Sequence, residues 1–294
     1  MRSIRANFHG YVLLLPALLS VLFIVVYPLF VILQLGFREG RSLNFSRIAQ
    51  QPLGIANYVS VLTDPAFWNS VRVTIIYVAG SAFASSVIGL ITALLLNERF
   101  PLRRMFRALV LLPWAVPGVI VSISFIWLFD ASFGVVNSVL RHVGLINGDV
   151  AWFVNGRTAL FAVMLPTIWK GYPFCTLTTL AAMQSIPHSL YEAAEIDGAA
   201  RFARFRYITW PGIRAAGILG LTLSALWMFR DFDIIFAATG GGPAWATQTL
   251  SLFVYDESFS FFRMGTACAI GTLMIVVASL ACLVAMRSVR KEYF

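Results

Sequence analysis

Long runs of apolar residues, separated by short polar segments, dominate the hydrophobic pattern of this 294-residue chain. An α-helix needs about 20 residues to cross the ~30 Å hydrocarbon core of a lipid bilayer. Six runs are long enough to do so, at residues 11–35, 73–96, 108–129, 160–182, 217–236 and 265–286. The pattern therefore predicts an all-α polytopic membrane protein that has six transmembrane helices and forms one domain over residues 1–294.

The composition agrees with this prediction and excludes other classes of protein. Hydrophobic residues make up 59% of the chain and charged residues 12%, whereas soluble globular proteins carry about 25% charged residues. The net charge of +9 does not indicate nucleic-acid binding, because the basic residues are spread between the apolar runs instead of forming one patch.

The distribution of basic residues predicts the orientation in the membrane. If the N-terminus is cytoplasmic, the inner side holds thirteen of them: Arg2, Arg5, Arg99, Arg103, Arg104, Arg107, Arg201, Arg204, Arg206, Arg214, Arg287, Arg290 and Lys291. The outer side then holds seven: Arg38, Arg41, Arg47, Arg72, Arg141, Arg157 and Arg263. Because cytoplasmic loops are richer in Arg and Lys, both termini are expected in the cytoplasm.

The loop at residues 185–211, between the fourth and fifth runs, has the features of a folded hairpin. Ser189 is a suitable helix N-cap, and Glu192 three residues later would complete a capping box. Gly198 suits the C-terminal cap, where a positive φ is needed. We expect one helix over 189–197, a second short helix around Arg201, and the start of the fifth span at Pro211.

The composition of the first of these helices indicates contact with another protein. Its acids, Glu192, Glu195 and Asp197, disfavour contact with the negatively charged inner leaflet. Ala193 and Ala194 are small and allow a close approach. The alternative is an amphipathic helix that rests on lipid headgroups.

The same loop resembles the EAA motif of binding-protein-dependent ABC importer permeases, and its extended form is similar to the carbohydrate-uptake branch with maltose- and glycerol-3-phosphate-type systems. The resemblance rests on Glu192-Ala193-Ala194, Gly198, Ile208 and Pro211, with Trp210 departing from the usual aliphatic residue. It implies a coupling helix that contacts an ATPase through Ser189, Glu192, Ala193, Ala194, Asp197 and Gly198. Weaker similarities lie at Asn57-Tyr58, Asp64-Pro65, Phe67-Trp68, Thr74, Arg230–Asp233, Thr239–Pro243, Thr247, Tyr255 and Phe259.

The chain lacks the residues of an ATP-hydrolysing site, because neither Lys170 nor Lys291 lies in a P-loop context. The resemblance therefore implies that two separate ATPase subunits bind ATP and Mg²⁺, and that this chain is not itself an enzyme. It also implies a second, homologous permease in a heterodimer, an extracytoplasmic solute-binding protein, and the bacterial inner membrane as location. Scattered histidines (His9, His142, His188) and cysteines (Cys175, Cys268, Cys282) give no metal-ligand spacing.

Ionisable and aromatic residues at membrane depth are candidates for the path of a sugar-like substrate. The fourth and fifth runs supply them: Trp169, Tyr172, Trp227, Arg230 and Asp233, with Lys170 and Asp231 beside them. Each has a simpler interpretation. Arg230 and Asp233 lie one turn apart and could neutralise each other, and Lys170 could extend to the membrane interface.

Three other functions are open to such a chain. A stand-alone secondary carrier needs an intramembrane ion site and usually two related halves, and neither is evident in the sequence. A membrane-embedded enzyme needs a reactive constellation within the spans, whereas the histidines fall outside them. A passive anchor leaves the capped helix of the loop unexplained. The charge of the solute, neutral or anionic, stays open.

Overall fold

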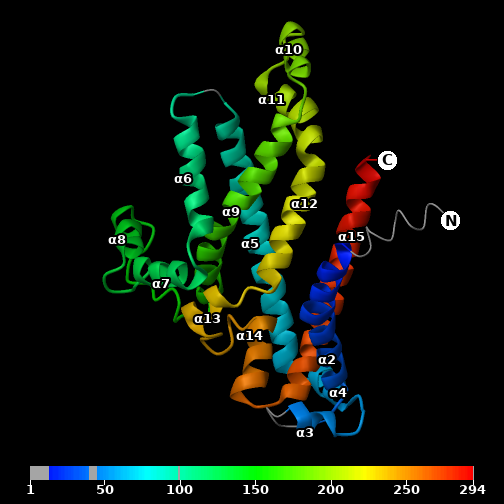
Figure 1. Ribbon diagram of the computed structural model, residues 1–294. Coiled ribbons are helices and arrows are strands. Elements are labelled where there is room, and N and C mark those ends of the chain that lie inside the picture. Colours follow the sequence, from blue (N-terminus) through cyan, green and yellow to red (C-terminus); the bar gives the residue numbers. More distant parts are fainter. Residues whose placement is uncertain (1–12, 40–44, 99, 294) are drawn as a thin grey trace, which may run out of the picture. The chain divides into compact units, whose positions relative to one another are not determined.

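The computed structural model describes residues 13–39, 45–98 and 100–293 (Figure 1). These described residues form helices and their connections, with one isolated β-bridge between Arg38 and Leu53. The prediction of an all-α fold is therefore confirmed. Residues 11 and 12 of the first predicted span lie outside the described residues, as do His9, Arg2, Arg5, Arg41 and Arg99.

Four helical segments of the described chain are long and apolar enough to cross a bilayer. They are Leu13–Gly36, Pro65–Asn97, Arg201–Phe229 and Met264–Val284, and they cover the first, second, fifth and sixth predicted spans. The fourth predicted span falls within α9 (Ala159–Gln184). That helix carries more polar residues and does not reach the same hydropathy, so the count of six spans stays a prediction.

The third predicted span, residues 108–129, is not one continuous helix. Helix α6 (Arg103–Ala115) and helix α7 (Gly118–Leu128) meet at an angle of 96°. Val116 between them is extended, with φ −75° and ψ 132°. Pro117 explains the break, because it disfavours the helical conformation at the preceding residue and has no N–H for the helical ladder.

The fifth predicted span, residues 217–236, has different bounds at both ends. Helix α11 (Arg201–Arg204), the π-helical turn η2 (Phe205–Thr209) and α12 (Trp210–Phe229) run on as one helix of 29 residues. The expected separate helix and the start at Pro211 are therefore wrong. Trp210 N–H bonds to Phe205 O in the wider π turn, which lets the helix pass through a proline that cannot donate.

This helix ends at Phe229, not at residue 236. The chain then turns through Arg230, Asp231 and Phe232 before α13 (Asp233–Thr239) begins. Gly240, with φ +56°, caps α13 in the left-handed conformation that glycine adopts without strain.

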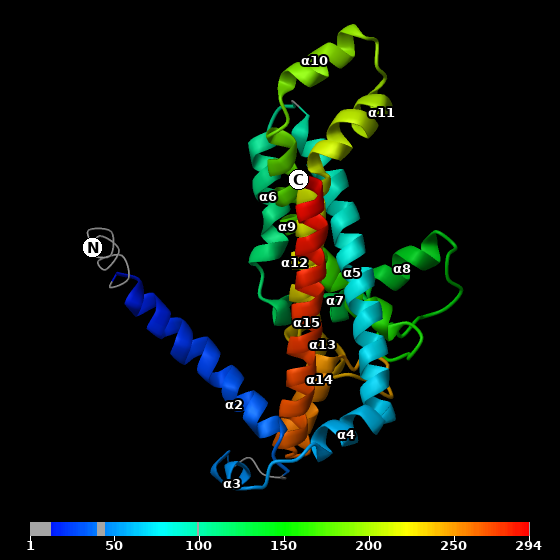
Figure 2. The ribbon, with the colours of Figure 1, turned by 90° about the vertical axis from the view of Figure 1, so that its right-hand side faces the viewer.

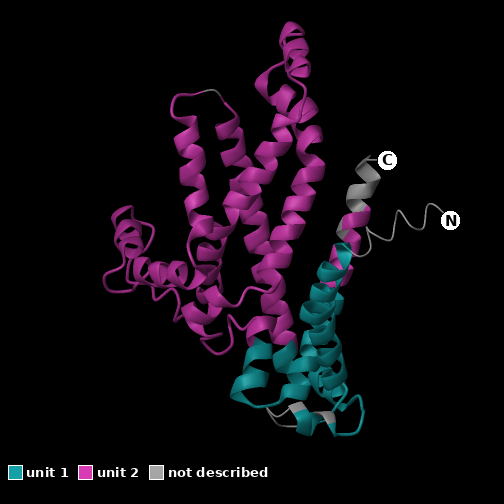
Figure 3. Cartoon of the chain, viewed as in Figure 1, with its two compact units in different colours: residues 1–67, 253–277 teal, residues 68–252, 278–294 magenta. Residues whose placement is uncertain are grey.

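The chain divides into two compact units (Figure 3). Unit 1 comprises residues 1–67 and 253–277, and unit 2 comprises residues 68–252 and 278–294. Within unit 1 lie η1 (Leu22–Val26), α2 (Tyr27–Gly36), α3 (Phe45–Ala49), α4 (Ala56–Thr63), η3 (Asp256–Ser260) and the first part of α15 (Met264–Tyr293).

The core of unit 1 joins α2 to α3 and α15 through Leu35, Ile48 and Cys268. Asn57 holds the end of α2, because its Nδ2 donates to Gly36 O at 3.0 Å and to Arg38 O at 2.9 Å. Such a side chain satisfies carbonyls that have no partner within the helix. The sequence analysis singled out Asn57 only through a weak family similarity, and this contact shows that its side chain stabilises the end of α2.

Unit 2 is a bundle in which α5 (Pro65–Asn97), α6, α9 and α12 run side by side (Figures 1 and 2). The buried side chains of Tyr77, Val163, Met228 and Ile235 form part of its core. Close packing depends on small residues, since a Cβ at Gly89 would lie 2.5 Å from Cys175 Cβ. This unit also contains α7, α8 (Val135–His142), α10 (His188–Ile196), α11 and α13, and the boundary between the two units falls within α14 (Leu250–Tyr255).

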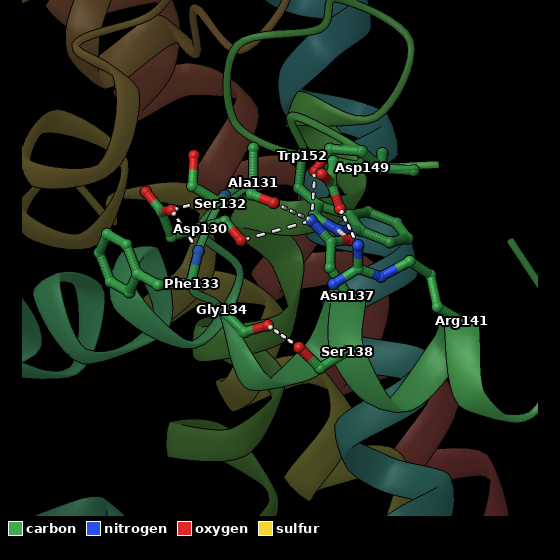
Figure 4. Close-up of polar contacts among 11 residues, drawn as sticks. Asp130, Ala131, Ser132, Phe133, Gly134, Asn137, Ser138, Arg141, Asp149 and Trp152 are labelled. Carbon is green, nitrogen blue, oxygen red and sulfur yellow. Dashed lines mark hydrogen bonds and ion pairs between the residues drawn. The ribbon is translucent and has the colours of Figure 1, made fainter. Parts of the chain in front are cut away.

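Residues 130–158, between α7 and α9, form a folded lobe around one asparagine (Figure 4). Asn137 is 1% exposed, and its Nδ2 donates to the carbonyls of Asp130, Ala131 and Val150 at 3.0–3.3 Å. Its Oδ1 accepts a hydrogen bond from Trp152 Nε1 at 2.8 Å. Residues 130–131 and 150–152 of this lobe are therefore tied together through a single amide, a feature that the hydrophobic pattern did not predict.

Replacing Asn137 with alanine should destabilise the lobe by about 2–3 kcal/mol, because buried carbonyls and the Trp152 N–H lose their partner. Hydrogen exchange of residues 130–158 in the detergent-purified protein measures the effect. Ser138→Ala is the matched control: its exposed hydroxyl makes one long bond of 3.4 Å to Gly134 O, so a change within about 0.5 kcal/mol is expected. Equal exchange rates in the two variants would contradict the role of Asn137.

A second buried polar group lies in η3 of unit 1, outside the membrane-spanning helices. Glu257 is 3% exposed, and its Oε2 has no hydrogen-bond partner. Its Oε1 lies 3.4 Å from a guanidinium nitrogen of Arg263. Burial raises the pKa of the Glu257 carboxyl, and the nearby Arg263 opposes the shift only in part.

A raised pKa in the folded protein makes this group favour folding most at low pH. Its contribution is fully present below the ordinary glutamate pKa of about 4.3 and is lost as pH rises through the folded pKa. Glu257→Gln should therefore raise the thermal midpoint at neutral pH, and the gain should vanish as the pH falls. Arg263→Gln should have the opposite effect at neutral pH. A Glu257→Gln gain that grows toward acid pH would contradict the assignment.

Candidate functional site

A hairpin at one end of the unit 2 bundle contains the residues of the predicted coupling helix (Figures 1 and 2). Helix α10 forms its first arm, and the start of the 201–229 helix forms the second. No residue of α10 is buried. The hairpin therefore extends away from the bundle and offers the whole length of α10 to a partner.

The turn after α10 has the geometry expected at Gly198. This residue has φ +72°, and its N–H bonds to Glu195 O at 3.1 Å. The N–H of Ala199 bonds to Ala194 O at 2.8 Å. These two bonds form a Schellman motif, which satisfies the last carbonyls of the helix. The prediction that Gly198 supplies a left-handed cap is confirmed by this geometry.

The start of α10 differs from the predicted capping box. The helix begins at His188, its N-cap is Pro187, and no side chain bonds to the free N–H groups. Ser189 is already the second helical residue. The Glu192 carboxylate instead lies 3.1 Å from His188 Nδ1, one turn back. Pro187 sets the entry of the chain, with φ −57° and ψ 130°, so the predicted capping box of Ser189 and Glu192 is wrong.

Two polar contacts hold the arms of the hairpin together. Glu195 forms an ion pair with Arg204 on the second arm, and Tyr191 Oη lies 2.9 Å from Thr209 Oγ1. Below them the arms are in close contact, since a Cβ at Gly212 would lie 2.6 Å from Ile186 Cδ1. The hairpin is therefore braced along its length.

Large apolar side chains on the hairpin are exposed. Ile196 is 87% exposed, Phe202 and Tyr207 are each 77% exposed, and Leu190 is 49% exposed. Exposed apolar groups of this size, next to polar ones, are typical of surfaces that bind another protein. Glu192, Ala193 and Asp197 are exposed on the same arm, and Ala194 is half-buried.

The second candidate region is a pocket of about 190 Å³ inside unit 2. It lies where the broken helices α6/α7 and α12/α13 meet α9. Its lining is Trp114, Gly118, Thr167, Lys170, Gly171, Phe174, Ser224, Trp227, Met228, Asp231, Asp233 and Ile234. The walls combine large aromatic faces with hydroxyl and charged groups, which is the chemistry of a site for a small polar molecule.

The pocket brings together only some of the predicted substrate-path residues. Trp227 and Asp233 line it, whereas Trp169 lines a neighbouring pocket beside Phe125. Tyr172 and Arg230 are in the lining of neither of these two pockets. Among the described residues no ion pair joins Arg230 to Asp233, so the predicted mutual neutralisation is not present.

Lys170 has a structural contact in this pocket and does not extend to an interface. Its Nζ donates to Val116 O at 2.6 Å and to Trp114 O at 3.1 Å. Both carbonyls lie at the end of α6, where Pro117 has interrupted the ladder. A cation at the C-terminus of a helix satisfies free carbonyls and complements the helix dipole. Lys170 therefore stabilises the break in the third span.

Asp231 is held by a chain of hydroxyl groups that cross the bundle. Tyr77 Oη donates to Asp231 Oδ2 at 2.8 Å and lies 2.6 Å from Thr167 Oγ1. The tyrosine is fully buried on α5. The backbone of the same turn is also satisfied, since Ser251 Oγ donates to Asp231 O at 2.7 Å. The turn after α12 is thus fixed from both sides.

Sequence reasoning missed several residues of the pocket. Trp114, Thr167 and Phe174 were not expected in the lining, and neither was Tyr77 expected to hold Asp231. Trp114 stands between two prolines, Pro113 and Pro117, which was the signal that could have marked it. Tyr77 had no such signal, because its partner Asp231 is 154 residues away. Among the described residues no group of His, Cys, Asp and Glu could hold a metal ion.

Residues 85–291 match the family described as "Binding-protein-dependent transport system inner membrane component". The chain is 37% identical to the trehalose/maltose transport system permease protein MalF of Thermococcus litoralis, over 92% of this chain and 90% of that protein. It is 34% identical to the sulfoquinovosyl glycerol transport system permease protein SmoG of Agrobacterium fabrum, over 95% of this chain and 90% of that protein.

The fold is similar to that in crystal structures of a bacterial ABC transporter involved in the import of the acidic polysaccharide alginate. One has a TM-score of 0.84 and covers 99% of this chain and 98% of that chain. The other, in complex with an alginate pentasaccharide-bound periplasmic protein, has a TM-score of 0.83 and covers 99% and 96%. The identity is 24% in both cases, so this similarity concerns the fold alone.

Replacing Lys170 with methionine should lower the stability of the purified protein by at least about 2 kcal/mol, because two backbone carbonyls lose a bond to a charged donor. Thermal unfolding in detergent measures the effect. Lys170→Arg keeps a cation and should recover part of the loss. If the methionine variant unfolds at the midpoint of the unmodified protein, the carbonyls of the break do not depend on Lys170.

Proposed function

Because the chain belongs to the family of inner-membrane components of binding-protein-dependent transport systems, we propose that it is a permease subunit of an ATP-driven importer for a sugar or sugar derivative. The observation that carries the proposal is the braced, exposed hairpin at residues 188–204, at one end of a bundle that holds a polar and aromatic pocket. The hairpin offers a contact for an energy source, and the pocket offers a place for a solute.

The proposed topology has six spans, with α9 as the fourth and the bent pair α6/α7 as the third. Helix α9 carries Lys170, Thr167 and Thr176, and polar side chains within a span are tolerated where they face protein or a cavity. The excess of basic residues on one side supports cytoplasmic termini and a cytoplasmic hairpin. The whole chain then acts as one permease domain in the bacterial inner membrane.

The proposed complex contains two ATPase subunits, a second permease and an extracytoplasmic solute-binding protein. ATP and Mg²⁺ are bound by the ATPase subunits, since this chain has no P-loop sequence. Family membership supports a solute-binding partner, as the family's description names binding-protein-dependent transport. A heterodimer with a different permease is favoured by the resemblance to carbohydrate systems.

In the proposed mechanism α10 lies in a groove on one ATPase and moves with it. Glu192 and Asp197 face the ATPase as charged contacts, Ala193 and Ala194 permit the close approach, and Gly198 keeps the turn. Because the arms are tied by Glu195–Arg204 and Tyr191–Thr209, a displacement of α10 moves the 201–229 helix with it. The spans then alternate between inward-open and outward-open states.

A sugar is the proposed substrate class because of the pocket's surfaces. Aromatic faces pack against the C–H faces of a sugar ring, and hydroxyl or carboxylate groups bond to its hydroxyls. Trp227 and Asp233 supply one group of each kind. The relatives named for trehalose/maltose and sulfoquinovosyl glycerol transport support the same class. Trp169, Tyr172 and Arg230 stay candidates for a second part of the path.

A stand-alone secondary carrier is the alternative. It would take up solute without an ATPase, and the exposed apolar residues of the hairpin would then have no partner. The purified chain, reconstituted alone in vesicles, should show no ion-gradient-driven uptake of maltose or trehalose. Such uptake would favour the carrier.

The proposal is tested by purifying the tagged chain from its native membranes in a mild detergent and identifying every co-purifying protein. An ATPase and a second permease should be recovered. Glu192→Lys should remove the ATPase and retain the second permease, because a reversed charge on α10 disrupts only the ATPase contact. Glu98→Lys, an exposed acid outside the hairpin, is the control and should retain both. Recovery of the intact chain alone would refute the importer.

A further inference from the structure

A second cavity of unit 2, of about 210 Å³, lies between α7 and α9 at the break in the third span. Its lining is Val116, Val121, Ser124, Phe125, Leu128 and Trp169. None of these residues lines the pocket proposed for the solute. The break itself accounts for the space, because α7 turns away from α6 at 96° after the extended residue Val116.

The side chains that line this cavity offer water little to bond. Four of the six are aliphatic or phenyl groups, and Trp169 adds a large aromatic ring. The hydroxyl of Ser124 is already engaged, since it donates to Ile120 O at 2.8 Å within its own helix. A water in a cavity needs about two to four polar partners, whereas an apolar cavity stays dry and accepts apolar molecules.

The aromatic part of the wall is held in place by ring contacts. The Phe125 ring centroid lies 6.1 Å from that of Phe129 in a stacked arrangement, and 6.0 Å from that of Trp169. Because the second contact joins α7 to α9, the wall cannot close over the cavity without the loss of aromatic packing. A molecule from outside the chain is therefore the better way to fill the space.

The cavity opens at its rim, where Leu128 is 42% exposed and Trp169 is 38% exposed. Helix α7, which forms much of this rim, has no charged residue. Apart from Ser124, its exposed side chains are apolar: Val119, Ile120, Ile123, Trp127 and Leu128. Together with α6 it is apolar enough to count as a membrane span. The rim therefore faces the hydrocarbon chains of the bilayer.

We propose that an acyl chain of a membrane phospholipid occupies this cavity and fills the space that the break opens between α7 and α9. A flexible alkyl chain follows the shape of the walls and supplies the dispersion contacts that an empty cavity lacks. This inference goes beyond the proposed function, because the ligand is a lipid and not the solute. It gives Trp169 a contact with lipid in place of a part in the solute path.

The test uses the full chain, purified with the proteins that accompany it and reconstituted in vesicles of phosphatidylethanolamine and phosphatidylglycerol. Part of the phosphatidylethanolamine carries a photoreactive diazirine within one acyl chain, and mass spectrometry locates the labelled residues. Val121 lines the cavity and is 2% exposed, whereas its neighbour Ile120 is 54% exposed and lies outside the lining. Both should be labelled. Label on Ile120 without label on Val121 would overturn the inference.

Two phenylalanine variants separate the cavity from general contact with lipid. Ser124→Phe places a ring in the cavity from its own wall, and Ser279→Phe places the same ring at an exposed position of α15. Labelling of Val121 should fall several-fold in Ser124→Phe, and labelling of Ile120 should not change. Ser279→Phe should leave both unchanged. Equal labelling of Val121 in the two variants would contradict a lipid in the cavity.

Removal of lipid in detergent gives a second measurement, which does not depend on labelling. It should lower the thermal midpoint of the unmodified protein, and by roughly 2–4 °C less in Ser124→Phe, because the new ring takes the place of the acyl chain. Equal falls in the two proteins would count against the inference.

Two further results would assign the cavity to another occupant and overturn the lipid site. Loss of Val121 labelling when maltose is added would place the cavity in the solute path. Absence of label on both Val121 and Ile120, with a second permease cross-linked to this part of α7, would show that protein covers the rim.

Discussion

Inside a bilayer no water is available for a backbone group that a broken helix leaves unbonded, and this constraint governs the middle of unit 2. Two helices break there, one after α6 and the other after α12. The free carbonyls of the first break bond to Lys170. At the second, Ser251 donates to Asp231 O, and Ser122 of α7 donates to Ile234 O in the first turn of α13. The pocket exists because the breaks open the bundle, and it persists because these side chains satisfy the backbone.

The hairpin and the pocket are linked by one continuous element. The helix over Arg201–Phe229 has 29 residues, so it is roughly 43 Å long at 1.5 Å per residue. One end carries Arg204, which is paired with α10, and the other end carries Trp227 in the pocket wall. Because the π turn at Phe205–Thr209 accommodates Pro211 without interrupting the helix, no hinge separates the two ends.

The parts of the fold that depend on local sequence were predictable, and the parts that depend on distant contacts were not. Long apolar runs give the helices, and Gly198 gives its turn because only a local φ is involved. The continuity of the third span and the start of the fifth were not predicted, because a proline has opposite effects at Pro117 and Pro211. In the first case the helix ends, and in the second a π turn absorbs the missing donor.

In the candidate site, too, residues whose role depends on local sequence were predicted, and residues whose role depends on distant contacts were not. Trp227 and Asp233 were found because they lie in the right helices, whereas Tyr77 was missed because its role depends on Asp231 across the bundle. Lys170 was identified as a charge at membrane depth, but its bonds to α6 follow only from the broken helix. Periodicity and motif spacing carry no information on such contacts.

The three charged residues of the pocket differ in how far the fold depends on them, and this affects which of them can change as permeases diverge in sequence. Lys170 is bonded to the backbone at the first break, and the Asp231 carboxylate at the second break is bonded to Tyr77 on α5, so a substitution at either would alter the scaffold and the pocket together. The Asp233 carboxylate makes no such hydrogen bond among the described residues. A substitution at Asp233, the acid in the first turn of α13, would therefore change the charge of the pocket and cost the fold only about 0.3–1 kcal/mol from the helix dipole.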